Sequence, residues 1–220
     1  MLVAGIDEAG RGCVIGPLVI AGILIKQENI NTLTQLGVKD SKLLTAKKRE
    51  ILVPKIIHLA EKYAVLKLIP QEIDRAVESH RKLHKLNRLE AETMAQIVTM
   101  LKPRIAYVDA ADVLEKRFAS HIQEASLFKT SIIAEHKADK TYPVVSAASI
   151  IAKVERDKHV AQLREQYGDF GTGYLTDPKT SVFLTEWLKT HRDYPECVRK
   201  SWKPAKIAKN QQGTMQTKLS

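Results

Sequence analysis

The sequence predicts an α/β protein with one central mixed five-stranded sheet flanked by helices, and with a C-terminal helical region. Two observations lead to this fold class. Two aliphatic, β-branched runs open the chain with no helical pattern between them, whereas helix and strand patterns alternate farther along. Beyond His136 the remaining patterns are helical.

Five apolar segments with strand character account for the sheet. The first two are joined by a turn at residues 10–12, whose glycines are typical of a hairpin. The third run ends at Pro70, and the fourth follows Pro103. The expected strands cover residues 2–6, 14–25, 63–69, 105–108 and 130–136.

Helical spacing of apolar residues fills the gaps between these runs. From Ala147 to Val154 the apolar residues fall at i, i+3, i+4 and i+7, the stripe that a helix buries. Pro143 suits the start of this helix and Gly168 its end. The expected helices cover residues 46–60, 84–101, 114–124, 143–167 and 178–190.

Composition favours a nucleic-acid partner. Lys and Arg total 35 against 25 Asp and Glu, a net charge of +10, and such an excess favours polyanions. Cys13 and Cys197 form neither a disulfide framework nor a zinc pattern, so a reduced cytoplasmic compartment is expected. The start lacks the pattern of a signal peptide, and no apolar run of about 18 residues predicts a membrane span.

Four acidic residues stand at the ends of predicted strands. Asp7 and Glu8 end the first strand, Asp109 ends the fourth and Asp139 follows the fifth. Carboxylates that meet at one sheet edge repel one another unless cations intervene, and hard oxygen ligands suit Mg²⁺ or Mn²⁺. Two such ions can hold the attacking and leaving oxygens of a phosphodiester. A metal-dependent nuclease is the leading hypothesis, with ordinary loop and cap acids as the alternative.

The glycine turn GRGCVIG, residues 10–16, nearly matches a dinucleotide fingerprint. Its third glycine comes one position late, and a strand follows where a helix is required, so no dinucleotide site is expected. Arg11 either binds phosphate or is exposed on a tight hairpin turn, and both interpretations stay open. A serine hydrolase is disfavoured because G-x-S-x-G is absent, and Ser146 and Ser149 are expected to pack or cap a helix.

Eight segments carry a more specific signal as a set, and they follow one another over about residues 1–205. They are GIDEAGRG at 5–12, VIGPLV at 14–19, KDSKLLT at 39–45, YVDAAD at 107–112, AEHKAD at 134–139, YPVVSAASIIAKVERD at 142–157, GTGYLTDPKT at 171–180 and VRKSWK at 198–203. Taken together, these segments closely resemble the ribonuclease HII family, particularly its archaeal form.

The resemblance implies an endonuclease that cuts the RNA strand of RNA–DNA hybrids. It also implies nicking of duplex DNA 5′ to an embedded ribonucleotide, leaving a 3′-hydroxyl and a 5′-phosphate. The implied fold is ribonuclease H-like. We expect a catalytic domain over residues 1–170, a substrate-gripping helical region over 171–205 and a partly disordered basic tail over 206–220.

The resemblance also assigns roles to individual residues. The family's catalytic, metal-binding carboxylates fall on Asp7, Glu8, Asp109 and Asp139. They imply two Mg²⁺ or Mn²⁺ ions, with Asp7 bridging both. The family's turn, whose backbone contacts the ribose 2′-hydroxyl, falls on Gly10, Arg11 and Gly12. Its sugar-stacking tyrosine falls on Tyr174, and its phosphate-binding element falls on Ser41 and Lys42.

Three positions depart from the family pattern. Cys13 follows the turn where proline is common, and a structural thiol is expected there. Leu43 replaces a lysine and is expected to remove one phosphate contact. Leu175 replaces a proline beside Tyr174, which puts the rigidity of this tyrosine in doubt.

Two other activities fit the same fold, a non-catalytic nucleic-acid binder and a nuclease of branched DNA. Intact carboxylates argue against the binder, and the turn with Tyr174 favours ribose sensing over branch sensing. Residues Gln216–Ser220 begin the pattern of the sliding-clamp peptide of some archaeal relatives, without the aromatic residues that complete it. Either the match is chance and the peptide is absent, or the sequence was cut just before the aromatic residues. The chain as given is therefore expected to bind a clamp weakly, and nothing in the sequence demands more than a monomer.

Overall fold

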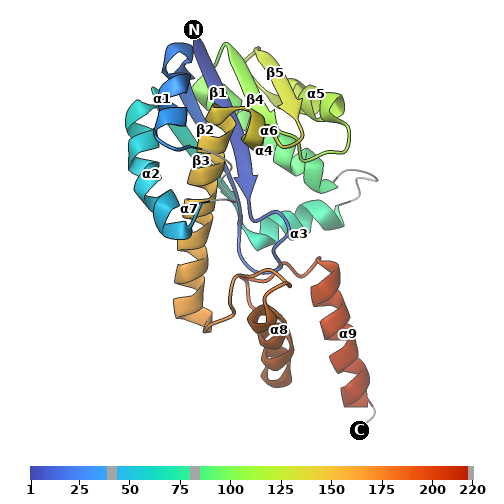
Figure 1. The fold of residues 1–220 in the computed structure, drawn as a ribbon. Helices are drawn as coiled ribbons and strands as arrows, with labels where there is room; N and C mark the ends of the chain where they lie inside the picture. Colours follow the sequence, from blue (N-terminus) through green and yellow to red (C-terminus); the bar gives the residue numbers. More distant parts are fainter. Residues whose placement is uncertain (39–43, 80–84, 218–220) are drawn as a thin grey trace. The chain divides into compact units, whose positions relative to one another are not determined.

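The computed structural model describes residues 1–38, 44–79 and 85–217, and the side chains up to residue 210. A five-stranded sheet forms its centre, in the order β3-β2-β1-β4-β5 (Figure 1). β1 is antiparallel to β2 and parallel to β4, and β4 is parallel to β5. The strands are β1 Leu2–Ala9, β2 Leu18–Lys26, β3 Lys62–Leu68, β4 Ile105–Asp109 and β5 Ser131–Glu135. This confirms the predicted mixed sheet, with the first strand at its middle.

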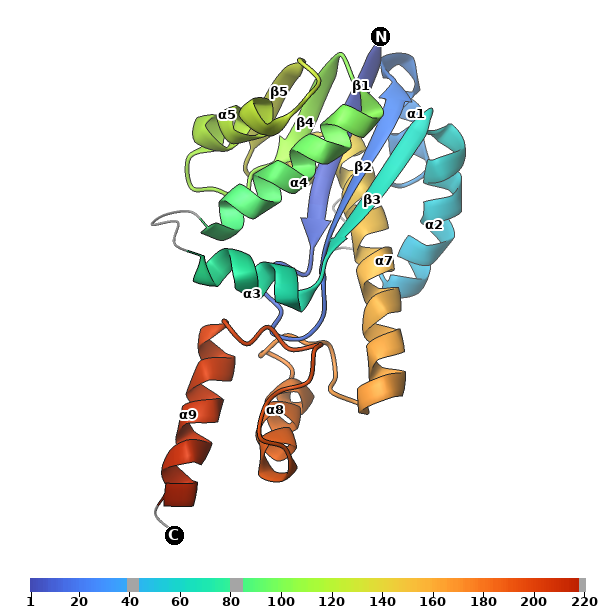
Figure 2. The ribbon, with the colours of Figure 1, turned by 180° about the vertical axis from the view of Figure 1, so that it is seen from behind.

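Helices cover both faces of the sheet. α7 crosses one face in Figure 1, and α4 crosses the other in Figure 2. The helices that accompany the sheet are α1 Ile30–Gln35, α2 Ala46–Leu59, α4 Lys85–Leu101, α5 Glu115–Ala125, α6 Ala138–Thr141 and the first part of α7 Pro143–Tyr167. α4 packs against α5. A sheet covered on both faces requires apolar strands, and β2 is buried at every residue except Lys26.

The chain divides into two compact units made of interleaved segments. Unit 1 consists of residues 1–9, 19–67 and 82–155, and unit 2 consists of residues 10–18, 68–81 and 156–220. The predicted domain limits at residues 170 and 205 concern function and order, and they stay predictions. No described helix is long and apolar enough to cross a membrane.

Unit 2 has an aromatic core of its own. Phe170 and Phe183 pack with their ring centroids 5.6 Å apart, and Phe183 packs against Trp187 at 5.4 Å. Its helices are α3 Pro70–Glu78, the second part of α7, α8 Pro178–Thr190 and α9 Lys203–Thr217. Figure 1 shows α8 and α9 side by side, and their residues are in contact. α9 is helical through most of the stretch predicted as a basic tail.

The predicted hairpin between the first two strands is wrong in detail. β2 begins at Leu18, because the backbone of residues 14–16 bonds elsewhere. Val14 N–H donates to Gly173 O at 2.8 Å, and Gly16 N–H donates to Cys197 O at 2.8 Å. Gly10–Pro17 is therefore a loop held by later parts of the chain, and it is not a tight turn.

Helix α3 was not predicted. Pro70 ends the strand pattern, and it also occupies the first turn of a helix, where its missing N–H costs nothing. Glu72 completes this start, since its carboxylate accepts a hydrogen bond from Ile69 N–H at 2.9 Å. A proline between two elements therefore marks the end of one and the start of the next.

We predict that Gly5→Ala lowers the free energy of unfolding by about 1–3 kcal/mol. A Cβ at Gly5 falls on the backbone carbonyl of Val144 in the first turn of α7, which cannot move independently of the helix. Gly22→Ala is the matched control, because its Cβ meets a side-chain methyl of Ile97 and not the backbone of a helix, so its cost is expected to be smaller. Denaturant unfolding measures both, and equal losses would contradict the argument.

Candidate active site

The acids selected from the sequence lie at one edge of the sheet in unit 1. Asp7 stands near the end of β1, and Asp109 is the last residue of β4. β1 and β4 are parallel, with Ile6 beside Val108, so their carboxyl ends meet at the same edge. Asp139 lies in α6, which follows β5.

Asp7 is the most perturbed of these acids. Its side chain is buried, and burial followed by the negative charge of Asp109 raises its pKa to about 7. Hydrogen bonds from the Ser149 hydroxyl and the Glu8 N–H, the latter at 2.7 Å, and the positive charge of Lys153 act in the opposite direction. The structure therefore brings Asp7 and Asp109 close enough to repel each other.

Asp109 is tied to the segment that carries Asp139. Its Oδ1 accepts a hydrogen bond from Ala138 N–H at 2.8 Å. Lys137, just before this amide, has φ 59° and ψ 33°, a left-handed conformation that is uncommon outside glycine. Asp139, the residue after Ala138, is 3% exposed. The bend at Lys137 therefore holds Asp139 one residue from the amide that binds Asp109.

The convergence of all four acids is not preformed. Consecutive side chains on a strand point to opposite faces of the sheet. The half-buried Glu8 therefore points to the face opposite to that of Asp7. Among the described residues, no three acidic, histidine or cysteine side chains form a group that could hold a metal ion. Carboxylates repel one another, and the charges of Asp7 and Asp109 do so in this structure.

The donors nevertheless suit a hard divalent cation. All four acids present oxygen ligands, which Mg²⁺ and Mn²⁺ prefer. Burial and the charge of Asp109 disfavour the ionised form of Asp7, and a cation beside the pair would reverse this effect. The residues present therefore fit a divalent ion at the Asp7–Asp109 edge.

Two residues near Asp7 were not selected from the sequence. Ser149 donates a hydrogen bond to Asp7, and Lys153 Nζ donates to Ser149 Oγ at 3.2 Å. Both lie on α7 four residues apart, a spacing that places them on one helix face. Ser149 was expected to pack or cap, and its contact with the acid becomes visible only once α7 is placed against the sheet.

The predicted ribose-contacting residues lie together in unit 2. A Cβ built on Gly12 would be 3.8 Å from the Tyr174 ring, so the turn and the tyrosine are neighbours. The Arg156 guanidinium carbon lies 4.8 Å from the centre of that ring. Burial is the main cause that raises the pKa of the Tyr174 hydroxyl. Ser41 and Lys42 lie outside the described residues.

The loop that carries Tyr174 is fixed although Leu175 stands where the resemblance led us to expect a proline. Asp177 N–H donates to Tyr174 O at 3.0 Å, and the Asp177 carboxylate accepts from Thr172 N–H at 2.8 Å. Arg156 also donates to the Thr172 carbonyl. Gly173 has φ +80°, and a Cβ there would collide with the Ile15 carbonyl. These contacts hold the tyrosine although Leu175 is not a proline.

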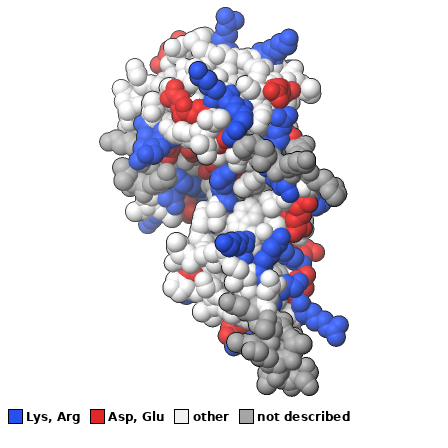
Figure 3. Space-filling view, turned by 90° about the vertical axis from the view of Figure 1, so that its right-hand side faces the viewer, with Lys and Arg blue, Asp and Glu red and all other residues white. Residues whose placement is uncertain are grey.

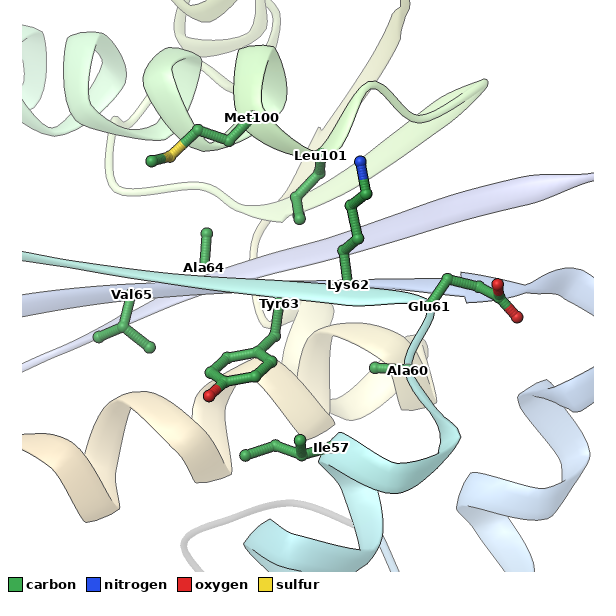
Figure 4. A pocket seen from close by; sticks show the side chains of 9 residues that line it. All are labelled: Ile57, Ala60, Glu61, Lys62, Tyr63, Ala64, Val65, Met100 and Leu101. Carbon is green, nitrogen blue, oxygen red and sulfur yellow. The ribbon is translucent and has the colours of Figure 1, made fainter.

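Positive and negative side chains are mixed on one face of the molecule. On the face shown in Figure 3, Lys and Arg side chains lie among acidic ones. A hollow of about 460 Å³ beside the edge strand β3 contains none of the selected residues (Figure 4). It is lined by Ile57, Ala60, Glu61, Lys62, Tyr63, Ala64, Val65, Met100 and Leu101.

The sheet order, with Asp7 beside Asp109 at the ends of two parallel strands, agrees with the ribonuclease H-like class of nucleases. Residues 4–205 match the family model described as Ribonuclease HII. A Ribonuclease HII of Pyrococcus horikoshii is 50% identical over 208 residues, covering 94% of this chain and 92% of that protein. The Ribonuclease HII of Archaeoglobus fulgidus is 46% identical over 200 residues, covering 91% and 93%. The chain belongs to the ribonuclease HII family.

Solved structures agree with this assignment. The crystal structure of ribonuclease H2 from Pyrococcus horikoshii OT3 has a TM-score of 0.87 at 47% identity, covering 96% of this chain and 98% of that one. The RNase HII in a PCNA:RNase HII complex from Archaeoglobus fulgidus has a TM-score of 0.83 at 45% identity, covering 92% and 96%. The chain is thus an endoribonuclease of RNA–DNA hybrids, from a family that depends on divalent metal ions.

We predict that Asp7→Asn stabilises the metal-free protein more near pH 8 than near pH 5, and least near pH 4. The pKa of Asp7 is raised from 3.8 unfolded to about 7 folded, so the stability that its protonated form contributes falls as pH rises from about 4 and is fully lost above about 7. The upper bound is about 4 kcal/mol. Thermal melts in EDTA measure the difference, with Glu186→Gln, an exposed position on α8, as control. A stabilisation that does not grow with pH would contradict the assignment.

Proposed function

We propose that the chain hydrolyses a phosphodiester 5′ to a ribonucleotide in RNA–DNA hybrids and in DNA containing a single ribonucleotide. The products carry a 3′-hydroxyl and a 5′-phosphate. The observation that carries this proposal is the buried Asp7 beside Asp109 at the carboxyl edge of parallel strands, in a chain of this family.

The acids Asp7, Glu8, Asp109 and Asp139 are proposed to hold two Mg²⁺ or Mn²⁺ ions. When bound, such ions lower the pKa of water and offset the charge of the leaving oxygen. The protein's own work is to hold the ligands still. Ser149 and the Glu8 N–H fix the Asp7 carboxylate, and the Ala138 N–H fixes that of Asp109.

Substrate recognition is assigned to unit 2. The 2′-hydroxyl is both a donor and an acceptor, and it is the group that distinguishes RNA from DNA. The backbone of Gly10–Gly12 is proposed to bind this hydroxyl, and the Tyr174 ring to stack on the neighbouring sugar. The neighbourhood of Gly12 and Tyr174 supports this assignment. Ser41 and Lys42 are proposed to bind phosphate.

We predict a single nick when a DNA duplex with one ribonucleotide is incubated with the protein and Mg²⁺ or Mn²⁺. The nick should lie 5′ to the ribonucleotide and be lost in EDTA and in Asp109→Asn, because one ligand is then neutral. Denaturing gels report the position of the cut, and Glu186→Gln on α8 should cut normally.

The all-DNA duplex separates this proposal from its rival. No cutting of that control is expected, whereas equal cutting of both duplexes would favour a branched-DNA nuclease. Absence of any nick with either ion would refute the proposed reaction.

We also propose that contact with a sliding clamp runs through the C-terminal peptide and is weak for Gln216–Ser220 alone. An archaeal relative of 45% identity has been solved in a PCNA:RNase HII complex. The peptide here begins the clamp pattern but has no aromatic residues after it. Residues 218–220 lie outside the described part of the chain.

Titration with an archaeal sliding clamp should therefore show no strong binding by the chain as given. Two phenylalanines appended after Ser220 should strengthen binding at least tenfold through apolar burial, and two appended alanines should not. Calorimetry measures these affinities. Tight binding by the unextended chain would overturn this proposal.

A further inference from the structure

Arg199 is an arginine that unit 2 buries completely. Its side chain is 0% exposed, although arginine is rarely buried to this extent. The guanidinium donates hydrogen bonds to three carbonyl oxygens of one loop, those of Gly16 (from Nε, 3.1 Å), Arg11 (from Nη1, 2.8 Å) and Gly10 (from Nη2, 2.6 Å). The loop that accepts these hydrogen bonds contains Gly10–Gly12, whose backbone is proposed to bind the ribose 2′-hydroxyl.

The backbone around Arg199 fixes this side chain against the loop. Arg199 N–H donates to Val14 O at 2.8 Å, and Ile15 forms an antiparallel bridge with Val198. The Trp202 ring centre lies 5.0 Å from the guanidinium carbon, a cation–π contact. The arginine therefore approaches the loop from a short, paired segment, and a small shift would break several bonds at once.

Peptide geometry makes these carbonyl contacts informative about the opposite side of the turn. In a trans peptide the C=O of one residue and the N–H of the next point in opposite directions. No cis peptide is present among the described residues. Because Arg199 binds the carbonyls of Gly10 and Arg11, the N–H groups of Arg11 and Gly12 point away from the guanidinium.

We propose that Arg199 is a positioning residue that presents the Arg11 and Gly12 N–H groups to the ribose 2′-hydroxyl. The inference rests on the proposed ribose-sensing role of Gly10–Gly12. Donors held in place before the substrate arrives need no reorganisation when it binds, as in an oxyanion hole. A flexible glycine turn gains this property only if something outside the turn fixes it.

Cys13 completes the arrangement in this chain. Its thiol donates to Gly10 O at 3.0 Å and accepts from Arg199 Nη2 at 3.0 Å. A proline, common at this position in the family, offers neither contact. Cys13 and Arg199 therefore bind each other and the same carbonyl oxygen, that of Gly10. Because sulfur hydrogen bonds are weak, Cys13→Ala is expected to weaken the preference for ribose only about twofold.

The test compares Arg199→Lys with its parent for binding of two duplexes. Lysine keeps the charge but lacks the planar fork that reaches three carbonyls. In an Asp109→Asn background, which prevents cutting, affinity is measured for a duplex with one ribonucleotide and for its all-DNA counterpart. We expect the parent's preference for the ribonucleotide to fall at least tenfold, with affinity for the all-DNA duplex within about twofold.

Leu184→Ala is the matched control for stability. Leu184 is buried in the unit 2 core on α8, so its truncation destabilises this unit without removing any hydrogen bond to Gly10, Arg11 or Gly16. Leu184→Ala should keep the preference for the ribonucleotide duplex even when its melting temperature is lowered as much as that of Arg199→Lys. Loss of preference in both variants, its retention in Arg199→Lys, or its absence in the parent would overturn the inference. A failure of the unsubstituted chain to nick would instead refute the proposed function.

A measurement on the unsubstituted side chain covers the case in which Arg199→Lys does not fold. NMR of ¹⁵N-arginine protein should show slowly exchanging Nε–H and Nη–H signals of Arg199, unchanged when the ribonucleotide duplex binds. The amide signals of Arg11 and Gly12 should shift with that duplex and not with the all-DNA one. Release of the guanidinium on binding, or unshifted amides, would overturn the positioning role.

Discussion

The candidate site depends on one unfavourable contact, the placement of Asp7 beside Asp109 where two parallel strands end. Burial and mutual repulsion both oppose ionisation of Asp7. The fold offsets part of this cost with short bonds from the Ser149 hydroxyl, from the Glu8 N–H and, at Asp109, from the Ala138 N–H. The rest must come from the apolar core, where the wholly buried inner residues of β2 lie beside β1. Because ionising Asp7 beside Asp109 costs free energy without a cation, this edge of the sheet is suited to bind one.

The sequence predicts most of this fold because the strands are local apolar runs and the long helices have apolar residues at helical spacing. It misplaces the start of β2, because Val14 and Gly16 find backbone partners at Gly173 and Cys197, a long way along the chain. No local pattern records such pairing. The four acids could be selected because strand ends are readable, whereas the contact of Ser149 with Asp7 depends on how α7 packs. Family resemblance supplied Tyr174, whose nearness to Gly12 no spacing rule could give.

The two units use different parts of the chain for their work. In unit 1 the side chains are proposed to carry the chemistry, and strand register decides where they lie. In unit 2 the backbone of a loop is proposed to bind substrate, so side chains are used to fix that backbone. Arg199 binds its carbonyls, and Gly173 accepts from the amides of Val14 and Ile15. This explains why an arginine, the side chain with the most donors in a rigid fork, is buried among neutral acceptors.

Recognition through backbone amides has a consequence for the range of substrates. A 2′-hydroxyl is the same on every ribonucleotide, and a tyrosine ring can stack on any sugar. None of the residues assigned to binding reads a base edge, where sequence information lies. An enzyme built in this way discriminates ribose from deoxyribose with little regard to sequence. On this proposal its selectivity depends on the rigidity of a few peptide groups, and that rigidity comes from residues such as Arg199 that lie behind the turn.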